Sequence, residues 1–307
     1  SGGHRRGGPS SRHWGAVAAT GDVMGAALHP VVYPLQGRCT YESEPVEFVT
    51  MRNGSKVAID HVDIKARITL LFSHGNGEDL GCTMDLRRIA RALNVNVVAY
   101  DYSGYGKSEG RCSESATYAN IDAVWNYLTV DKGLRRETIV LWGRSLGSGP
   151  TCYLAQRLSR AEEPPGGVIL ASPLASVYKV VLTVSPLVGD MYPNYSRVKD
   201  FRCPTLVFHG LMDEVIPIRC GQEVAANVPD EFRAEPWWPS RAGHNNMELL
   251  YAVEMERRIA DFIRDHVSAA PAPPDEVKAE ATALKTSSLW SSVAGFFGSA
   301  AAASEST

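Results

Sequence analysis

The sequence lacks the features that mark membrane-spanning and nucleic-acid-binding proteins. It has no run of about twenty apolar residues, the length that a helix needs to cross the hydrocarbon core of a bilayer, so we expect no transmembrane helix. Its net charge is only −3 and it has no long Lys/Arg run, which argues against binding to the phosphate backbone of nucleic acids. With these two classes excluded, we expect an ordinary globular protein.

The cysteines lack the spacing of a disulfide framework or a zinc site. None of them forms a C-x-x-C pair, which favours reduced thiols and a cytoplasmic setting. We therefore predict no metal ion and no other cofactor. The six cysteines are Cys39, Cys82, Cys112, Cys152, Cys203 and Cys220.

The two ends of the chain lack the periodicity of the middle. Residues 1–40 are rich in Gly, Ser, Arg and Ala and are predicted to be a flexible N-terminal segment outside the fold. Residues 269–307, also predicted to lie outside the fold, open with an Ala/Pro stretch that is typical of a linker. Residues 41–268 are predicted to form one catalytic domain, because a chain with 44% hydrophobic residues can bury a substantial core. Since the sequence begins at Ser1 rather than at methionine, we expect a fragment that lacks any targeting signal.

The C-terminal stretch holds five apolar residues that would share one face of a short helix. Such a face suits a membrane interface, although few Lys/Arg residues are present to assist binding. Peripheral contact of a cytoplasmic protein with membranes is one expectation, and a partner-binding or disordered tail is the alternative. The five residues are Leu289, Trp290, Val293, Phe296 and Phe297.

Strand-like and helix-like segments alternate in the middle of the chain. An early pair of strand-like segments flanks Asn53-Gly54, a dipeptide favoured in tight hairpin turns. We predict an α/β fold with a mostly parallel twisted sheet, an N-terminal antiparallel hairpin and helices on both faces. The strand-like segments are residues 46–50, 56–60, 68–72, 95–100, 138–142, 167–170 and 205–208.

Two stretches carry apolar residues at helical spacing, and both stripes are predicted to face the core. The segment 172–200 breaks the alternation with three prolines and several tyrosines. Connections of this length are usually functional, so we predict a short lid over the site, with a plain connection as the alternative. The stripes are Ile121, Val124, Trp125 and Leu128, then Met255, Ile259, Phe262 and Ile263.

Gly143-Arg144-Ser145-Leu146-Gly147 directly follows a predicted strand and has the form of a nucleophile elbow. In the G-x-S-x-G pattern a strand ends, the chain turns sharply through the serine, and a helix begins. The flanking glycines are needed because a Cβ there would collide with the neighbouring strand or helix. Ser145 is therefore the candidate nucleophile, although the pattern alone also occurs in ordinary glycine-rich turns.

A serine hydroxyl needs a base that is itself oriented by a carboxylate. Asp213 follows the last predicted strand, and His244 lies just before the last helical stretch. The order Ser145, Asp213, His244 is that of the α/β-hydrolase fold. Glu214 and Asp190 are rival carboxylates.

The segment Ser73-His74-Gly75-Asn76-Gly77 follows the strand-like residues 68–72 and is a candidate oxyanion loop. The backbone N–H groups of Asn76 and Leu146 are predicted to form the oxyanion hole, one from this loop and one from the residue after the nucleophile. His74 is predicted to be structural, because a base on this loop would be misplaced.

The segments 74–81 and 100–110, together with four others, resemble the seventeenth subfamily of alpha/beta-hydrolase domain-containing proteins. The resemblance covers about residues 40–267. It implies a membrane-associated serine hydrolase that removes palmitate from cysteines of peripheral membrane proteins. It also implies the nucleophile Ser145, the orienting carboxylate Asp213 and the base His244. The animal members carry a lipidated N-terminal cysteine cluster, whereas here only Cys39 precedes the predicted domain. The matching segments are residues 74–81, 100–110, 118–125, 172–174, 209–216 and 243–249.

These observations predict a serine hydrolase that cleaves thioester or ester bonds through an acyl-enzyme. The expected substrate is an acylated protein or a lipid-like ester, and no nucleic-acid partner is expected. A serine peptidase or general carboxylesterase of the same fold is the alternative enzyme, since the same residues serve amides and esters alike. A hydrolase fold retained as a non-catalytic adaptor is the third reading.

Overall fold

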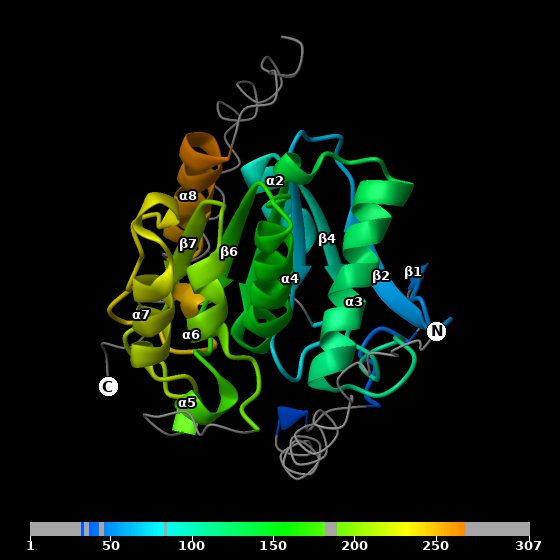
Figure 1. Cartoon of the computed structure of the whole chain (residues 1–307), viewed down its shortest axis with the longest axis horizontal. Helices are drawn as coiled ribbons and strands as arrows, with labels where there is room; N and C mark the ends of the chain where they lie inside the picture. The colour runs from blue at the N-terminus through cyan, green and yellow to red at the C-terminus, as the bar shows by residue number, and fades with distance from the viewer. Residues whose placement is uncertain (1–31, 34–36, 43–45, 83–84, 182–188, 268–307) are drawn as a thin grey trace, which may run out of the picture. The chain divides into compact units, whose positions relative to one another are not determined.

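The computed structural model describes residues 32–33, 37–42, 46–82, 85–181 and 189–267 (Figure 1). By its internal contacts the chain divides into two units, Ser1–Ser268 and Ala269–Thr307, and all described residues belong to the first. The expected linker and the apolar tail face lie outside the described residues. None of the helices in the described part has both the length and the apolar character required to cross a bilayer.

One sheet of seven strands, in the order β1-β2-β4-β3-β5-β6-β7, forms the centre of the first unit. β1 and β2 pair antiparallel, as do β2 and β4, and every other pair of neighbours is parallel. The predicted mostly parallel sheet with an N-terminal hairpin is confirmed. The strands are β1 Glu47–Thr50, β2 Lys56–Val62, β3 Thr69–Ser73, β4 Asn96–Tyr100, β5 Ile139–Arg144, β6 Gly167–Ala171 and β7 Thr205–Phe208.

The hairpin turns at the predicted dipeptide. Gly54 adopts a φ of +87°, and the Asn53 side chain accepts a hydrogen bond from the Ser55 N–H at 3.0 Å. β2 runs two residues beyond the predicted end, because its second half pairs with β4 from Ile59 opposite Tyr100 onward. A partner strand that is distant in sequence therefore decides where β2 ends.

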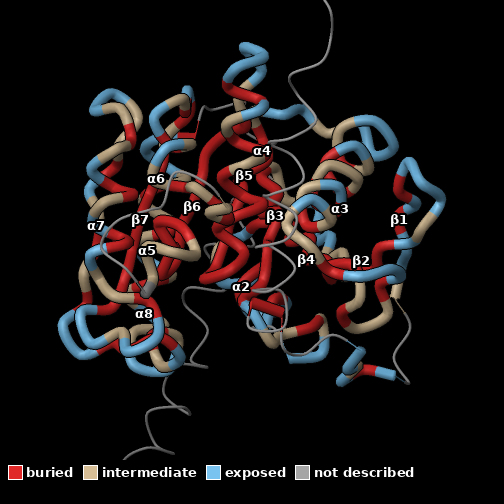
Figure 2. The backbone as a smooth tube through the Cα atoms, turned by 60° about the horizontal axis from the view of Figure 1, so that its bottom comes forward, coloured by how far each residue is buried: buried red, intermediate tan, exposed pale blue. Residues whose placement is uncertain are grey.

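Helices cover both faces of the sheet, as predicted. Successive residues of β3 point to opposite sides: Leu71 packs into a core with α3, α4 and α7, whereas Leu70 and Phe72 pack into a second core with α2 and α8. Buried residues, drawn in red, follow the strands through the middle of the structure (Figure 2). The helices are α2 Leu86–Leu93, α3 Glu114–Asn126, α4 Ser148–Arg160, α5 Val177–Val181, α6 Asn194–Arg197, α7 Ile218–Asn227 and α8 Met247–His266, with short turns η1 Tyr127–Asp131, η2 Arg136–Thr138, η3 Ser145–Gly147, η4 Val198–Asp200 and η5 Asp230–Phe232.

Both apolar stripes face these cores. Ile121 and Val124 of α3 are fully buried in the first core, and Met255 and Ile259 of α8 are buried in the second. The prediction that the stripes face the core is confirmed. An amphipathic helix of this length gains most of its stability from burying such a face.

Packing in the first unit begins ahead of residue 41. Val32 and Tyr33 are buried in the first core, and the Tyr33 hydroxyl lies 2.5 Å from the Tyr192 hydroxyl. The sequence did not signal this contact, since two isolated residues carry no periodicity.

The segment predicted as a lid is described only in part, and residues 182–188 lie outside the described residues. Its described end packs closely on the helix that follows Ser145. A Cβ on Gly149 would lie 2.2 Å from Cδ1 of Tyr192, and both Tyr192 and Asn194 are fully buried. This end of the segment is part of the core, and the lid stays a prediction.

Candidate active site

Ser145 lies where β5 ends and α4 is about to begin, with the short turn η3 between them. Its φ is +52°, a left-handed conformation that residues with a side chain rarely adopt. Such a conformation persists only where the surrounding structure imposes it, and it occurs often at functional sites.

The two motif glycines allow this turn. A Cβ on Gly147 would lie 2.0 Å from the backbone oxygen of Ser73, and a Cβ on Gly143 would lie 2.6 Å from the backbone oxygen of Gly147. Both distances are far shorter than any real carbon contact. The expected collisions with the neighbouring strand and the helix are therefore confirmed.

A buried asparagine supports the turn. The Ser148 hydroxyl donates to the Ser145 carbonyl at 2.6 Å, and the Asn194 side-chain amide donates to the Ser148 hydroxyl at 3.1 Å and to the Leu174 carbonyl at 3.0 Å. Asn194 was not predicted as part of the site. Its role depends on α6 meeting α4, which no local pattern indicates.

The structure brings the three predicted residues into one hydrogen-bonded chain. Ser145 Oγ lies 3.0 Å from His244 Nε2, and His244 Nδ1 lies 2.8 Å from Asp213 Oδ2. They come from the elbow after β5, the loop after β7 and the loop before α8. This is the arrangement in which an imidazole can take a proton from a serine hydroxyl while a carboxylate holds its other nitrogen.

The rival carboxylates bind backbone amides instead. Glu214 accepts a hydrogen bond from the His244 backbone N–H at 3.3 Å, and Asp190 accepts one from the Tyr178 N–H at 3.1 Å. Asp213 is the carboxylate that meets the imidazole.

Asp213 is held as a carboxylate by its hydrogen bonds. Its side chain is fully buried, and its Oδ1 accepts N–H groups of Ile216 at 2.7 Å and Val215 at 2.9 Å. Burial alone would raise its pKa, but the hydrogen bonds from His209 and His244 outweigh burial and hold the pKa well below its usual range. The charged carboxylate therefore favours a proton on His244 Nδ1, which leaves Nε2 free to accept from Ser145.

His209 is a site residue that the sequence reasoning missed. It is fully buried, and its Nε2 lies 2.8 Å from the Ile216 carbonyl and 3.1 Å from Asp213 Oδ2. Because a carbonyl only accepts, Nε2 carries the hydrogen. A Cβ on Gly221 would lie 2.4 Å from His209 Nδ1, so α7 packs directly on this ring. The available signal was its place four residues before Asp213 in a segment that carries the family resemblance.

The predicted oxyanion loop lies beside the elbow, because β3 and β5 are parallel neighbours and Ser73 pairs with Gly143. The Asn76 side chain donates to the Val32 carbonyl at 2.7 Å and accepts from the Tyr105 hydroxyl at 2.9 Å. These bonds hold the loop in place. The N–H groups of Asn76 and Leu146 remain the predicted oxyanion donors.

His74 on the same loop contacts its own surroundings rather than the serine. Its Nδ1 lies 2.8 Å from the Gly75 carbonyl oxygen, and its ring centroid lies 4.2 Å from that of Tyr102. Its Nε2 lies 3.6 Å from Asp101 Oδ1, beyond hydrogen-bonding distance. These contacts agree with a structural residue.

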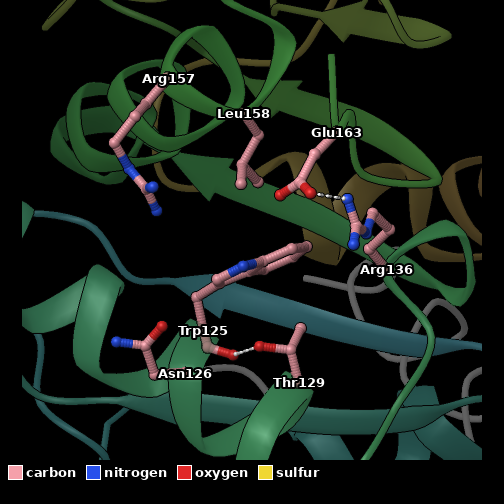
Figure 3. A pocket seen from close by; sticks show the side chains of 7 residues that line it. All are labelled: Trp125, Asn126, Thr129, Arg136, Arg157, Leu158 and Glu163. Atoms are coloured by element: carbon pink, nitrogen blue, oxygen red, sulfur yellow. Dashed lines mark hydrogen bonds and ion pairs between the residues drawn. The ribbon is translucent and has the colours of Figure 1, made fainter. Parts of the chain in front are cut away.

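Within the described part of the chain, no cluster of three or more His, Cys, Asp or Glu residues could hold a metal ion, and none of the six cysteines there forms a disulfide. A cavity of about 210 Å³ lies between α3 and the last turns of α4, with the Trp125 indole, Arg157, and the paired Arg136 and Glu163 around it (Figure 3). Since Ser145 precedes the first turn of α4, this cavity belongs to the opposite end of that helix.

Comparison with known proteins shows that the chain is similar in sequence to alpha/beta hydrolases. A family model described as "Hydrolase_4: Serine aminopeptidase, S33" matches residues 64–198, which include Ser145 but neither Asp213 nor His244. Alpha/beta hydrolase domain-containing protein aho-3 of Caenorhabditis elegans is 41% identical over 207 residues, 66% of this chain and 60% of that protein. Alpha/beta hydrolase domain-containing protein 17C of Mus musculus is 42% identical over 196 residues, 62% of this chain and 58% of that protein.

The chain thus spans about three fifths of the length of the curated relatives it matches. Among solved structures, the Pyrococcus furiosus esterase Pf2001 superposes with a TM-score of 0.60 at 15% identity, covering 76% of this chain and 100% of that one. The esterase RhEst1 from Rhodococcus sp. ECU1013 superposes with a TM-score of 0.58 at 16% identity, covering 73% and 100%. At identities this low, the two superpositions show a shared fold and nothing more. The chain has the alpha/beta-hydrolase fold and is similar in sequence to the alpha/beta hydrolase domain-containing proteins aho-3 and 17C.

Proposed function

We propose that this protein is a serine hydrolase that transfers an acyl group first to Ser145 and then to water. The observation that carries the proposal is the hydrogen-bonded chain from Ser145 through His244 to Asp213, with distances of 3.0 and 2.8 Å. The strained backbone of Ser145 is a second support, because an ordinary turn would not need it.

The chemistry follows from these contacts. His244 Nε2 takes the hydroxyl proton as Ser145 Oγ attacks the carbonyl carbon, and the N–H groups of Asn76 and Leu146 receive the oxyanion. The tetrahedral intermediate then collapses, and His244 passes its proton to the leaving thiolate or alkoxide. Water, deprotonated by the same imidazole, attacks the acyl-enzyme and releases the acid and Ser145.

The substrate class that we propose is a long-chain acyl thioester, as in a palmitoylated protein. The support is the resemblance of the sequence motifs to the seventeenth subfamily, together with 42% identity to alpha/beta hydrolase domain-containing protein 17C of Mus musculus. The two solved structures compared above are esterases, which favours an ester or thioester over an amide. A thiolate also leaves without the full protonation that an amine requires.

A peptidase is the second candidate, and one observation favours it: the matched family model is described as a serine aminopeptidase. Nucleophile, base and oxyanion donors of the same kind serve amides. The leaving group of the preferred substrate would therefore separate the two functions.

Labelling by a fluorophosphonate tests the nucleophile. The wild-type protein should be labelled at one residue, and Ser145→Ala should abolish labelling. Ser115→Ala is the matched control, because Ser115 is an exposed serine on α3 and its loss should leave labelling unchanged. Absence of labelling in a folded wild type would favour a non-catalytic adaptor.

Hydrolysis of paired thioesters and oxyesters of increasing chain length, alongside a peptide amide, tests the substrate class. Preference for long-chain thioesters, lost in Ser145→Ala, would support the proposal. Preference for a short ester would indicate a general carboxylesterase, and preference for the amide a peptidase.

A further inference from the structure

The second residue of the elbow motif, Arg144, has a buried side chain that the nucleophile elbow does not explain. The G-x-S-x-G pattern leaves this position open, yet only 9% of Arg144 is exposed. A buried guanidinium is costly unless its donors are paired, so its partners indicate what it is for.

Two of these partners belong to the loop that carries the base. Arg144 Nη2 donates to the backbone carbonyl of His244 at 3.3 Å and to the side-chain oxygen of Asn245 at 3.1 Å. Its Nε lies 3.4 Å from Oε1 of Glu248 in the first turn of α8. The guanidinium thus holds both the histidine itself and the start of the helix that follows.

The fourth partner, Glu78, directly follows the predicted oxyanion loop and binds its backbone. Arg144 Nη1 pairs with Glu78, whose Oε2 accepts the Gly75 backbone N–H at 2.8 Å. A Cβ on Gly75 would lie 2.8 Å from Arg144 Nη1, so the guanidinium lies directly against the residue before Asn76. Glycine at position 75 lets the arginine reach this far.

We propose that Arg144 is a positioning residue that holds the base loop and the oxyanion loop together around Ser145. The inference rests on the proposed serine hydrolase function and adds a residue to it. A guanidinium can serve both loops at once because its five N–H donors point in different directions in one plane. A lysine ammonium at the same place keeps the charge but cannot span both sets of acceptors.

The test compares Arg144→Lys with the wild type on the preferred ester or thioester. The number of competent sites is counted by complete fluorophosphonate labelling. Misplacing reacting groups by about 1 Å costs on the order of a hundredfold in rate, so we expect kcat per labelled site to fall roughly tenfold to a hundredfold with KM changed less than about threefold. Arg87→Lys is the matched control, since Arg87 forms an exposed ion pair with Asp60 and should retain the wild-type kcat.

Three outcomes would overturn the inference. One is a kcat within about threefold of the wild type. Another is a loss that disappears when activity is counted per labelled site, which is the signature of a merely structural role. The third applies if Arg144→Lys does not fold: Glu78→Gln, which weakens only the contact with the oxyanion loop, should then lower kcat per site about tenfold, and an unchanged kcat refutes the inference. A wild type that neither labels nor turns over any substrate would instead refute the proposed function.

Discussion

Two aspartates, Asp213 and Asp101, are buried beside histidines in this protein, and their surroundings shift their pKa values in opposite directions. Both side chains are fully buried, and each lies in a segment that follows the carboxyl end of a sheet strand. Asp213 Oδ2 lies 2.8 Å from His244, whereas Asp101 Oδ1 lies 3.6 Å from His74. Burial and a neighbouring histidine are therefore common to both sites.

The difference lies in the hydrogen-bond donors. Asp213 receives two backbone N–H groups and the imidazoles of His209 and His244. Asp101 receives the Leu80 N–H at 2.9 Å and the Tyr41 hydroxyl.

The pKa values follow the donors. Burial raises the pKa of Asp101 to about 6 despite His74 and Tyr41, while hydrogen bonds from two histidines reverse the effect of burial and keep the pKa of Asp213 well below its usual range. A buried carboxylate stays charged at neutral pH where enough donors replace water. Asp213, which is proposed to orient the base, has those donors, whereas Asp101 has fewer.

The largest effect is expected from Asp213→Asn. The amide nitrogen would face the two imidazoles as a donor and would drive the His244 proton from Nδ1 to Nε2. A protonated Nε2 cannot accept the proton of Ser145. Turnover should fall by about 10⁴-fold without unfolding, as measured by steady-state kinetics and circular dichroism. Turnover at the wild-type rate would refute the role assigned to Asp213.

Asp101→Asn should change stability rather than chemistry. Because the folded pKa is about 6 and the unfolded value is 3.8, the stability that this group contributes is fully present below pH 3.8 and is lost as the pH rises through 6. Relative to the variant, the wild type should lose about 3 kcal/mol of unfolding free energy between pH 3.5 and pH 7.5. Urea denaturation at the two pH values measures this difference, and a constant difference would show that folding does not change the pKa of Asp101.

His209→Phe removes one of the imidazole donors to Asp213 and leaves the Ile216 carbonyl without its partner. The unfolding free energy should fall by about 2 kcal/mol, and the pKa of Asp213 should rise, so that the stability that Asp213 contributes is lost at a higher pH on acidification, as urea denaturation measures. His209→Gln, whose amide nitrogen can donate from a similar place, is the control and should lose less. The same pH dependence of stability in the wild type and in both variants would show that His209 only fills space.

The smallest effect is expected from Tyr41→Phe. It removes a donor from Asp101 and the acceptor of the Lys107 N–H, and we expect a loss of about 1 kcal/mol in unfolding free energy at pH 7.5. The pKa of Asp101 should then rise above 6, moving the pH range of the stability loss upward. Urea denaturation across pH 4 to 8 checks this shift. If the pH range of the stability loss does not move, the Tyr41 hydroxyl does not lower the pKa of Asp101.

Local pattern was enough to predict the sheet and the position of Ser145. Strands buried on both faces leave continuous apolar runs, and the elbow needs glycine at two positions that tertiary contacts make obligatory. The strand ends differed by one or two residues wherever a partner decided them, as at the end of β2. Sequence order alone did not decide which of Asp213, Glu214 and Asp190 orients His244.

The sequence by itself determined the order of strands and helices, the elbow and the kinds of residue available for the site. Tertiary structure decided which carboxylate meets His244, and it brought His209, Asn194 and the Arg144 guanidinium into the site. The physical reason is range: periodicity and turn preference act over a few residues, whereas Ser145 and His244 are 99 residues apart. Contacts over that distance exist only once the sheet has brought the carboxyl ends of its strands together.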